Sequence, residues 1–134
     1  PVSAAEEIGR LVPAVAGLAA RSGVPISADT FAPEVAAAAA AAGAVAVNDI
    51  GGGTDAMLEA VAGAGCGYVL MHIEGPPRVE RPAPRYDDVV DRLKEFFAAR
   101  IERALASSPE AVVRAPEALD AVRMANRIAA AAAA

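Results

Sequence analysis

Residues 44–53 read AVAVNDIGGG, which is an apolar run followed by the polar pair Asn48 and Asp49, an isoleucine and three glycines. A short apolar run without alternation is typical of a strand that is buried on both faces, as strands of parallel sheets are. The glycines lack the Lys-Ser/Thr ending and the spacing of phosphate-binding loops. They let the backbone approach a ligand closely, because no Cβ stands in the way.

The same order of features occurs on both sides of this segment. Upstream, residues 24–30 read VPISADT, and downstream, residues 67–72 read GYVLMH. Each is an apolar run that ends in polar residues, so each predicts a further strand. We expect strands near 24–28, 44–48 and 67–71 that are adjacent and parallel.

Helical stretches alternate with these strands. A capping box at Ser3 and Glu6 predicts the start of a first helix, Pro33 the start of a second, and Thr54 or Asp55 the cap of a third. Apolar periodicity predicts a long helix over 86–105, a short strand over 111–113 and a last helix over 116–134. The proline-rich segment 73–85 lies between the third predicted strand and the helix over 86–105, and it predicts an irregular loop over the rim.

Strands that alternate with helices indicate parallel βα units in an α/β fold. The carboxyl ends of such strands carry the chemistry. We therefore expect Asp29, Asn48 and His72 on one rim. A structural alternative stays open for each residue, because Asp and Asn after a strand often cap a helix or make a turn. A lone His is also more often a satisfied structural group than a ligand contact.

Composition narrows the classes of function. The chain has 134 residues, a net charge of −5 and one cysteine, Cys66. The acidic balance argues against nucleic acid as a partner. A single cysteine excludes an internal disulfide and fits a cytoplasmic location, and we interpret Cys66 as a packing residue.

The alanine-rich run 35–47 is interrupted by Gly43, so we expect no membrane span. One His with scattered carboxylates predicts no zinc site.

The order and spacing of several segments resemble the dihydropteroate synthase family. The matching segments are PVSAAEEIGRLVP at 1–13, ISADT at 26–30, AVAVNDIGGG at 44–53, YVLMH at 68–72, GPP at 75–77 and YDDVV at 86–90. The resemblance is continuous to about residue 106. Beyond it, AVVR at 111–114 resembles the last barrel strand of the family, but the family's nearby His is missing and Ala115-Pro116-Glu117 follow instead.

The resemblance implies parallel βα units of a (β/α)8 TIM barrel, of which only part is present in one domain, 1–134. A complete barrel takes roughly 250 residues, so 134 cannot form one. We expect that the sequence joins pieces of a longer chain, with a break in continuity near 106–111. A truncated product is the alternative.

The resemblance also implies an enzyme that joins p-aminobenzoate to a pterin pyrophosphate and releases pyrophosphate, with Mg²⁺ as cofactor and a homodimer as assembly. The family's magnesium ligand would lie before Pro1, so no metal ligand is expected in this chain. Asp29 would be catalytic and would also bind the pterin. The other implied substrate-binding residues are Asn48, Ile50, Met71, His72 and Arg114.

Three other functions remain open at this point. One is a methyltetrahydrofolate-dependent methyltransferase, although Met71-His72 and the GPP segment favour the synthase. Another is a non-catalytic pterin-binding homologue. The last is a structural half-barrel that dimerises to bury its open sheet edge.

Overall fold

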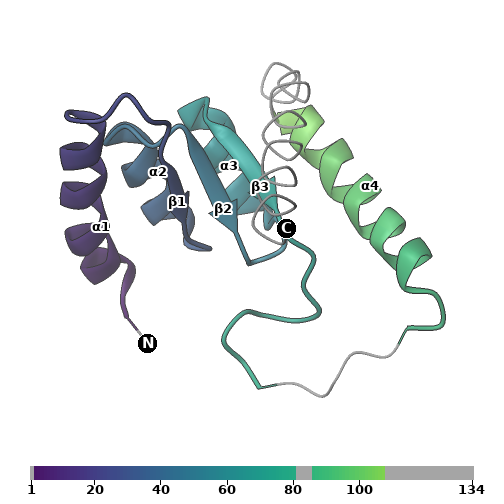
Figure 1. Ribbon diagram of the computed structural model, residues 1–134. Coiled ribbons are helices and arrows are strands. Elements are labelled where there is room, and N and C mark those ends of the chain that lie inside the picture. Colours follow the sequence, from purple (N-terminus) through teal and green to yellow (C-terminus); the bar gives the residue numbers. More distant parts are fainter. Residues whose placement is uncertain (1, 81–85, 108–134) are drawn as a thin grey trace, which may run out of the picture.

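The computed structural model describes residues 2–80 and 86–107, which form four helices and three strands (Figure 1). Their order is α1 (Ala4–Ala19), β1 (Ser27–Asp29), α2 (Pro33–Ala41), β2 (Ala46–Asp49), α3 (Asp55–Ala64), β3 (Gly67–Leu70) and α4 (Val89–Ser107). The predicted strand at 111–113 and the predicted helix at 116–134 lie outside the described residues, as does most of the expected break near 106–111.

The strands form one parallel sheet in the order β1-β2-β3. Asp29 is the register partner of Asn48, and Asn48 is the partner of Val69. In Figure 1, α2 and α3 lie behind the sheet, with α1 beside β1 and α4 beyond β3. The predicted adjacent, parallel βα units are therefore confirmed.

The first strand begins later than its sequence predicts, at Ser27 in place of Val24. Pro25 has no N–H to donate to a neighbouring strand, and Val24 is exposed. Pairing begins at Ile26, whose carbonyl accepts a hydrogen bond from the Val45 N–H at 2.9 Å. The strand also ends one residue later than predicted, so Asp29 is the last residue of β1 and not the residue after it.

The starts of α1 and α3 follow from local hydrogen bonds, and the start of α2 follows from a proline. The Ser3 hydroxyl accepts from the Glu6 N–H at 3.3 Å, while the Glu6 carboxylate pairs with Arg10. Pro33 opens α2 in its first turn, as predicted. Thr54, not Asp55, is the cap of α3, and its hydroxyl accepts from the Met57 N–H at 3.3 Å.

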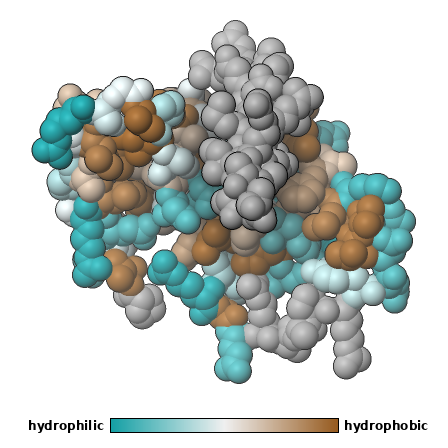
Figure 2. Space-filling model, in the orientation of Figure 1, coloured by the Kyte–Doolittle hydropathy of each residue, from teal (hydrophilic) through white to brown (hydrophobic). Residues whose placement is uncertain are grey.

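The long helix α4 begins at Val89, three residues later than predicted. The Asp88 carboxylate accepts hydrogen bonds from the N–H groups of Val90 and Asp91 at 2.8 and 3.1 Å, which fixes the start of the helix. No residue of α4 is fully buried. Figure 2 shows hydrophobic residues on the side of this helix that faces the viewer, and the exposed ones of α4 are Val89, Val90, Ile101 and Leu105.

The core lies between the sheet and its helices, in two clusters of small and medium side chains. One joins α1, β1 and α2 and contains Val15, Ala28, Ala39 and Ala44. The other joins α2, β2 and α3 and contains Ala36, Val47, Met57, Val61 and Cys66. Cys66 is thus a packing residue, and burial raises the pKa of its thiol, which makes the reactive thiolate scarce.

The segment that follows β3 has no helix or strand from Met71 to Glu80, in agreement with the predicted loop; the rest of that loop, 81–85, lies outside the described residues. None of the four described helices combines the length and the apolar character needed to cross a membrane.

Candidate ligand-binding rim at the carboxyl ends of the strands

Asp29 and Asn48 lie side by side at the carboxyl ends of β1 and β2. They are register partners in a parallel pair, so their side chains project from the same face of the sheet. This face is opposite to the one on which Ala28 and Val47 are buried in the core. Asp29 is exposed and Asn48 is half-buried, so both side chains can reach a ligand.

The backbone ties these two strand ends together. The Thr30 N–H donates to the Asn48 carbonyl at 3.1 Å, and the Met71 N–H donates to the Asp49 carbonyl at 3.3 Å. The predicted rim of Asp29 and Asn48 is therefore one continuous edge, on which Met71 follows the end of β3.

A pocket of about 360 Å³ opens beside Asp29. Its lining residues are Val2, Glu7, Arg10, Leu11, Ala14, Asp29 and Arg78. Apolar side chains of α1 form part of the wall, and two arginines and two carboxylates supply both donors and acceptors. Such a lining suits a small polar ligand with mixed hydrogen-bonding groups.

Two contacts hold the walls of this pocket. The buried Thr30 hydroxyl donates to the Glu7 carboxylate at 2.8 Å, which ties α1 to the end of β1. The Arg78 guanidinium lies 5.0 Å from the ring centroid of Phe31, within the range of a cation–π contact. Neither Glu7, Arg10 nor Arg78 was identified from the sequence, because nothing in their local pattern shows that they face Asp29.

Asp49 has a different role from its neighbour Asn48. Its carboxylate is buried, with 1% of the residue exposed, on the helix-covered side of the sheet. It accepts hydrogen bonds from the N–H groups of Gly51 and Gly53 at 2.5 and 3.0 Å and from the Tyr68 hydroxyl at 2.6 Å. Burial, together with the hydrogen bond to Asp49, raises the pKa of the Tyr68 phenol. Asp49 is thus a structural carboxylate.

The glycines that follow Asp49 allow close approach to the protein's own side chains. A Cβ at Gly52 would lie 2.9 Å from the Ile73 side chain, and one at Gly53 would lie 2.9 Å from the Leu70 side chain. Both glycines have positive φ, at 80° and 72°. These positions therefore require glycine for internal packing and backbone conformation.

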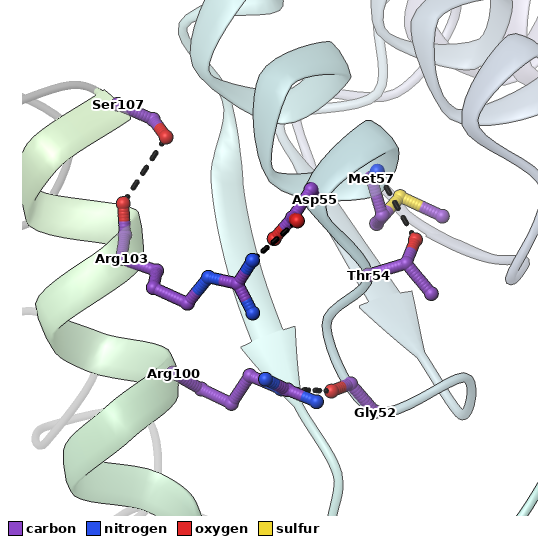
Figure 3. Close-up of polar contacts among 7 residues, drawn as sticks. All are labelled: Gly52, Thr54, Asp55, Met57, Arg100, Arg103 and Ser107. Atoms are coloured by element: carbon purple, nitrogen blue, oxygen red, sulfur yellow. Dashed lines mark hydrogen bonds and ion pairs between the residues drawn. The ribbon is translucent and has the colours of Figure 1, made fainter.

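Helix α4 is fastened to this loop and to the start of α3 by two arginines (Figure 3). The Arg100 Nε–H donates to the Gly52 carbonyl at 2.9 Å. Arg103, on the next turn of α4, forms an ion pair with Asp55. Figure 3 shows both side chains extending from α4 toward the loop and the amino end of α3.

His72 lies near the rim, and its described contacts join it to α4 and to its own loop. Its ring packs edge-on against Phe96, with 4.7 Å between ring centroids. Its Nε2 lies 3.2 Å from the Glu74 carboxylate, which also accepts from Arg92 at 3.1 Å. The hydrogen bond from Arg92 lowers the pKa of Glu74. A contact of His72 with substrate stays a prediction.

The remaining predicted site residues are placed as follows. Ile50 is half-buried directly after β2, and Met71 is 40% exposed directly after β3. Both are adjacent to the rim, and their role as apolar walls stays a prediction. Arg114 lies outside the described residues. Among residues 2–80 and 86–107, no three His, Cys, Asp or Glu side chains are grouped so that they could hold a metal ion.

Comparison with known proteins agrees with the resemblance seen in the sequence. The family model of pterin-binding enzymes matches residues 1–113. The dihydropteroate synthase of Escherichia coli K12 is 41% identical over 103 residues, which are 76% of this chain and 36% of the relative. That of Mycobacterium leprae is 43% identical over 105 residues, 75% of this chain and 36% of the relative. The chain thus spans little more than a third of the length of these curated relatives.

Solved structures give the same result. Dihydropteroate synthase from Stenotrophomonas maltophilia, with imidazole in its active site, superposes with a TM-score of 0.76 at 46% identity and covers 81% of this chain and 41% of that one. The Yersinia pestis enzyme, in complex with a sulfonamide drug, gives 0.74 at 40% identity, with 79% and 39% covered. The described βα units are therefore part of a (β/α)8 barrel, and the chain belongs to the family of pterin-binding enzymes.

Proposed function

We propose that the protein acts as a dihydropteroate synthase, which joins p-aminobenzoate to 6-hydroxymethyl-7,8-dihydropterin pyrophosphate and releases pyrophosphate in folate biosynthesis. The observation that carries this proposal is the pair Asp29 and Asn48, in register on one face of the sheet at the carboxyl ends of β1 and β2. The chain is 41% identical to a dihydropteroate synthase across this region. A related structure from Xanthomonas albilineans contains 7,8-dihydropteroate.

The pair has the chemistry that a pterin ring requires. A pterin is flat, and its edge carries both N–H donors and ring-nitrogen and carbonyl acceptors. The Asp29 carboxylate accepts hydrogen bonds from the donors, and the Asn48 amide offers one donor group and one acceptor. Ile50 and Met71 flank the rim and supply apolar contact to the ring faces, for which the adaptable Met side chain is suited.

In the proposed reaction, the amine nitrogen of p-aminobenzoate forms a bond to the exocyclic carbon of the pterin. The bond from that carbon to the pyrophosphate oxygen breaks, pyrophosphate leaves with the electron pair, and the amine loses a proton to solvent water. Positive charge develops at the exocyclic carbon as the leaving group departs. Asp29 stabilises this charge, because its carboxylate hydrogen-bonds the conjugated ring. Arg114 would contact the ring or its phosphates.

The proposal includes Mg²⁺ and a homodimer, which are supported by the family resemblance alone, and a cytoplasmic location, which is supported by the single cysteine. The described residues contain no cluster of three His, Cys, Asp or Glu side chains that could hold a metal ion, and no step above depends on one. The acidic net charge of −5 supports small molecules, and not nucleic acid, as the partners.

The test is a turnover assay on the full-length protein with p-aminobenzoate and the pterin pyrophosphate. Asp29→Asn keeps the shape of the side chain but removes its charge, so kcat should fall on the order of 100-fold. The Kd for 6-hydroxymethylpterin should rise less than about tenfold, since the amide that replaces the carboxylate can still hydrogen-bond the edge of the ring. Asp91→Asn is the control, because Asp91 is an exposed carboxylate of α4 paired with Lys94.

The same assay separates the synthase from a non-catalytic pterin-binding homologue. The sequence Ala115-Pro116-Glu117, which stands where the family has a His, favours that second candidate. A protein that binds 6-hydroxymethylpterin through Asn48 but releases no pyrophosphate would be the non-catalytic homologue. A protein that does neither would contradict both.

A further inference from the structure

The loop of residues 50–53, called here the glycine loop, is held from both sides by charged groups. The Asp49 carboxylate accepts from the N–H groups of Gly51 and Gly53. On the other side, the Arg100 guanidinium donates to the Gly52 carbonyl (Figure 3). Charge-assisted hydrogen bonds of this kind are stronger than those between neutral groups. The loop backbone is therefore fixed at the peptide groups that precede Gly51 and Gly53.

Side chains from β3 and α4 support this arrangement. The Tyr68 hydroxyl donates to Asp49 at 2.6 Å, on the same carboxylate oxygen that accepts from Gly53. A Cβ at Gly53 would lie 3.4 Å from both the Tyr68 hydroxyl and the Arg100 side chain, so both side chains pack directly on the loop. Gly52 and Gly53 are themselves buried. Asp49, Tyr68 and Arg100 together form what we call the loop clamp.

The loop clamp is adjacent to two residues of the proposed pterin site. Asn48 precedes Asp49 and projects from the opposite face of β2, and Ile50 follows Asp49 at the entry of the glycine loop. A shift of the Asp49 backbone would therefore move both. The direction in which a site group points is as important as its identity, because misplacement by about 1 Å can cost 100-fold in rate.

We propose that Tyr68 and Arg100 are positioning residues of the pterin site, which act through Asp49 and the glycine loop to hold Asn48 and Ile50 in place. This inference rests on the proposed pterin-binding function of the rim. It extends the site to helix α4, which is distant in the sequence: Arg100 lies 48 residues from Gly52. Neither residue touches the ligand in this arrangement.

Arg103 provides the matched control within the same helix. It lies one turn from Arg100 and also fastens α4, but through Asp55 at the start of α3 and not through the glycine loop (Figure 3). A general effect of α4 docking would appear in both Arg100→Met and Arg103→Met. An effect through the loop clamp would appear only in Arg100→Met and Tyr68→Phe.

The experiment measures two quantities on the full-length protein and its variants. One is the Kd for 6-hydroxymethylpterin by calorimetry, at a temperature where all variants are folded. The other is the hydrogen-exchange rate of the Gly51 and Gly53 amides without ligand, which reports on the loop clamp whether or not a pterin binds. Arg100→Lys is included because it keeps a donor for the Gly52 carbonyl.

Arg100→Met and Tyr68→Phe should each raise the exchange rates and raise Kd about tenfold, the lower end of what loss of an outer-shell hydrogen bond costs at metal sites. Arg103→Met should change neither, and Arg100→Lys should recover most of the affinity. Unchanged exchange in Arg100→Met, or an equal loss of affinity in Arg103→Met, would overturn the proposal. A parent protein that does not bind the pterin would instead refute the proposed function, while faster exchange in Arg100→Met would still support the loop clamp.

Discussion

At the scale of single residues, Asn48 and Asp49 show how two consecutive polar side chains take separate roles. Successive residues of a strand point to opposite faces, so Asn48 projects beside Asp29 while Asp49 is buried on the helix side. The sequence presents them as one polar pair at a strand end. Only the orientation of the sheet distinguishes the residue of the proposed pterin site, Asn48, from the buried structural one, Asp49.

Replacement of Asp49 should destabilise the fold. Asp49→Ala leaves three donors without an acceptor, namely two backbone N–H groups and the Tyr68 hydroxyl. An unsatisfied buried group costs about 1–3 kcal/mol, and of the three donors the Gly53 N–H is buried while the other two are part-buried. The free energy of unfolding should therefore fall by about 2 kcal/mol or more. Asp29→Ala, which removes an exposed carboxylate from the neighbouring strand end, should change it by less than about 0.5 kcal/mol. Urea denaturation measures both, and equal losses would refute the structural role of Asp49.

Tyr68 should make stability depend on alkaline pH. Its pKa is higher in the folded protein than in the unfolded chain, where a tyrosine titrates near 10. The unfolded chain therefore loses this proton first, so the contribution is complete below about pH 10 and is lost as the pH rises further. Tyr68→Phe should flatten the decline in urea midpoint between pH 8 and pH 11. A decline that persists in Tyr68→Phe would contradict this assignment.

At the scale of elements, the rhythm of strands and helices was predictable because its signals are local. Apolar runs, the Ser3 cap and Pro33 each act within a few residues. The errors are local as well: Pro25 delays β1, and the Asp88 side chain sets the start of α4. The glycines predict close approach of the loop backbone to a ligand, which stays a prediction; the structure adds that Gly52 and Gly53 pack against Ile73 and Leu70.

Substitution within the glycine loop tests that packing. Gly53→Ala places a Cβ 2.9 Å from Leu70 at a φ of 72°, so it should destabilise the protein by more than about 1 kcal/mol. Gly63→Ala is the control: Gly63 lies in α3 with nothing within 4 Å of the added Cβ, and Ala is the better helix former. It should stabilise by about 0.5 kcal/mol. Thermal melts of the two variants that shift in the same direction would show that the loop tolerates a side chain.

At the scale of the whole molecule, the rim could be predicted but its surroundings could not. Asp29 and Asn48 follow from the βα order, since parallel strands bring their carboxyl ends to one edge. The contacts of Glu7 with Thr30 and of Arg100 with Gly52 join residues 23 and 48 positions apart. No local pattern encodes such pairs, because they depend on how the helices pack around the sheet.

The central claim is that Asp29 and Asn48 bind a pterin at the rim of this sheet. The most direct test is calorimetry with 6-hydroxymethylpterin on the full-length protein, Asp29→Ala and Asn48→Ala, accompanied by thermal melts. Each substitution removes a hydrogen-bond partner from the polar edge of the bound pterin ring, which costs about 1–3 kcal/mol. The affinity should therefore fall roughly 5- to 150-fold, with melting temperatures close to that of the parent protein. Unchanged affinity in both variants, with intact melting curves, would mean that the pterin does not bind at this rim.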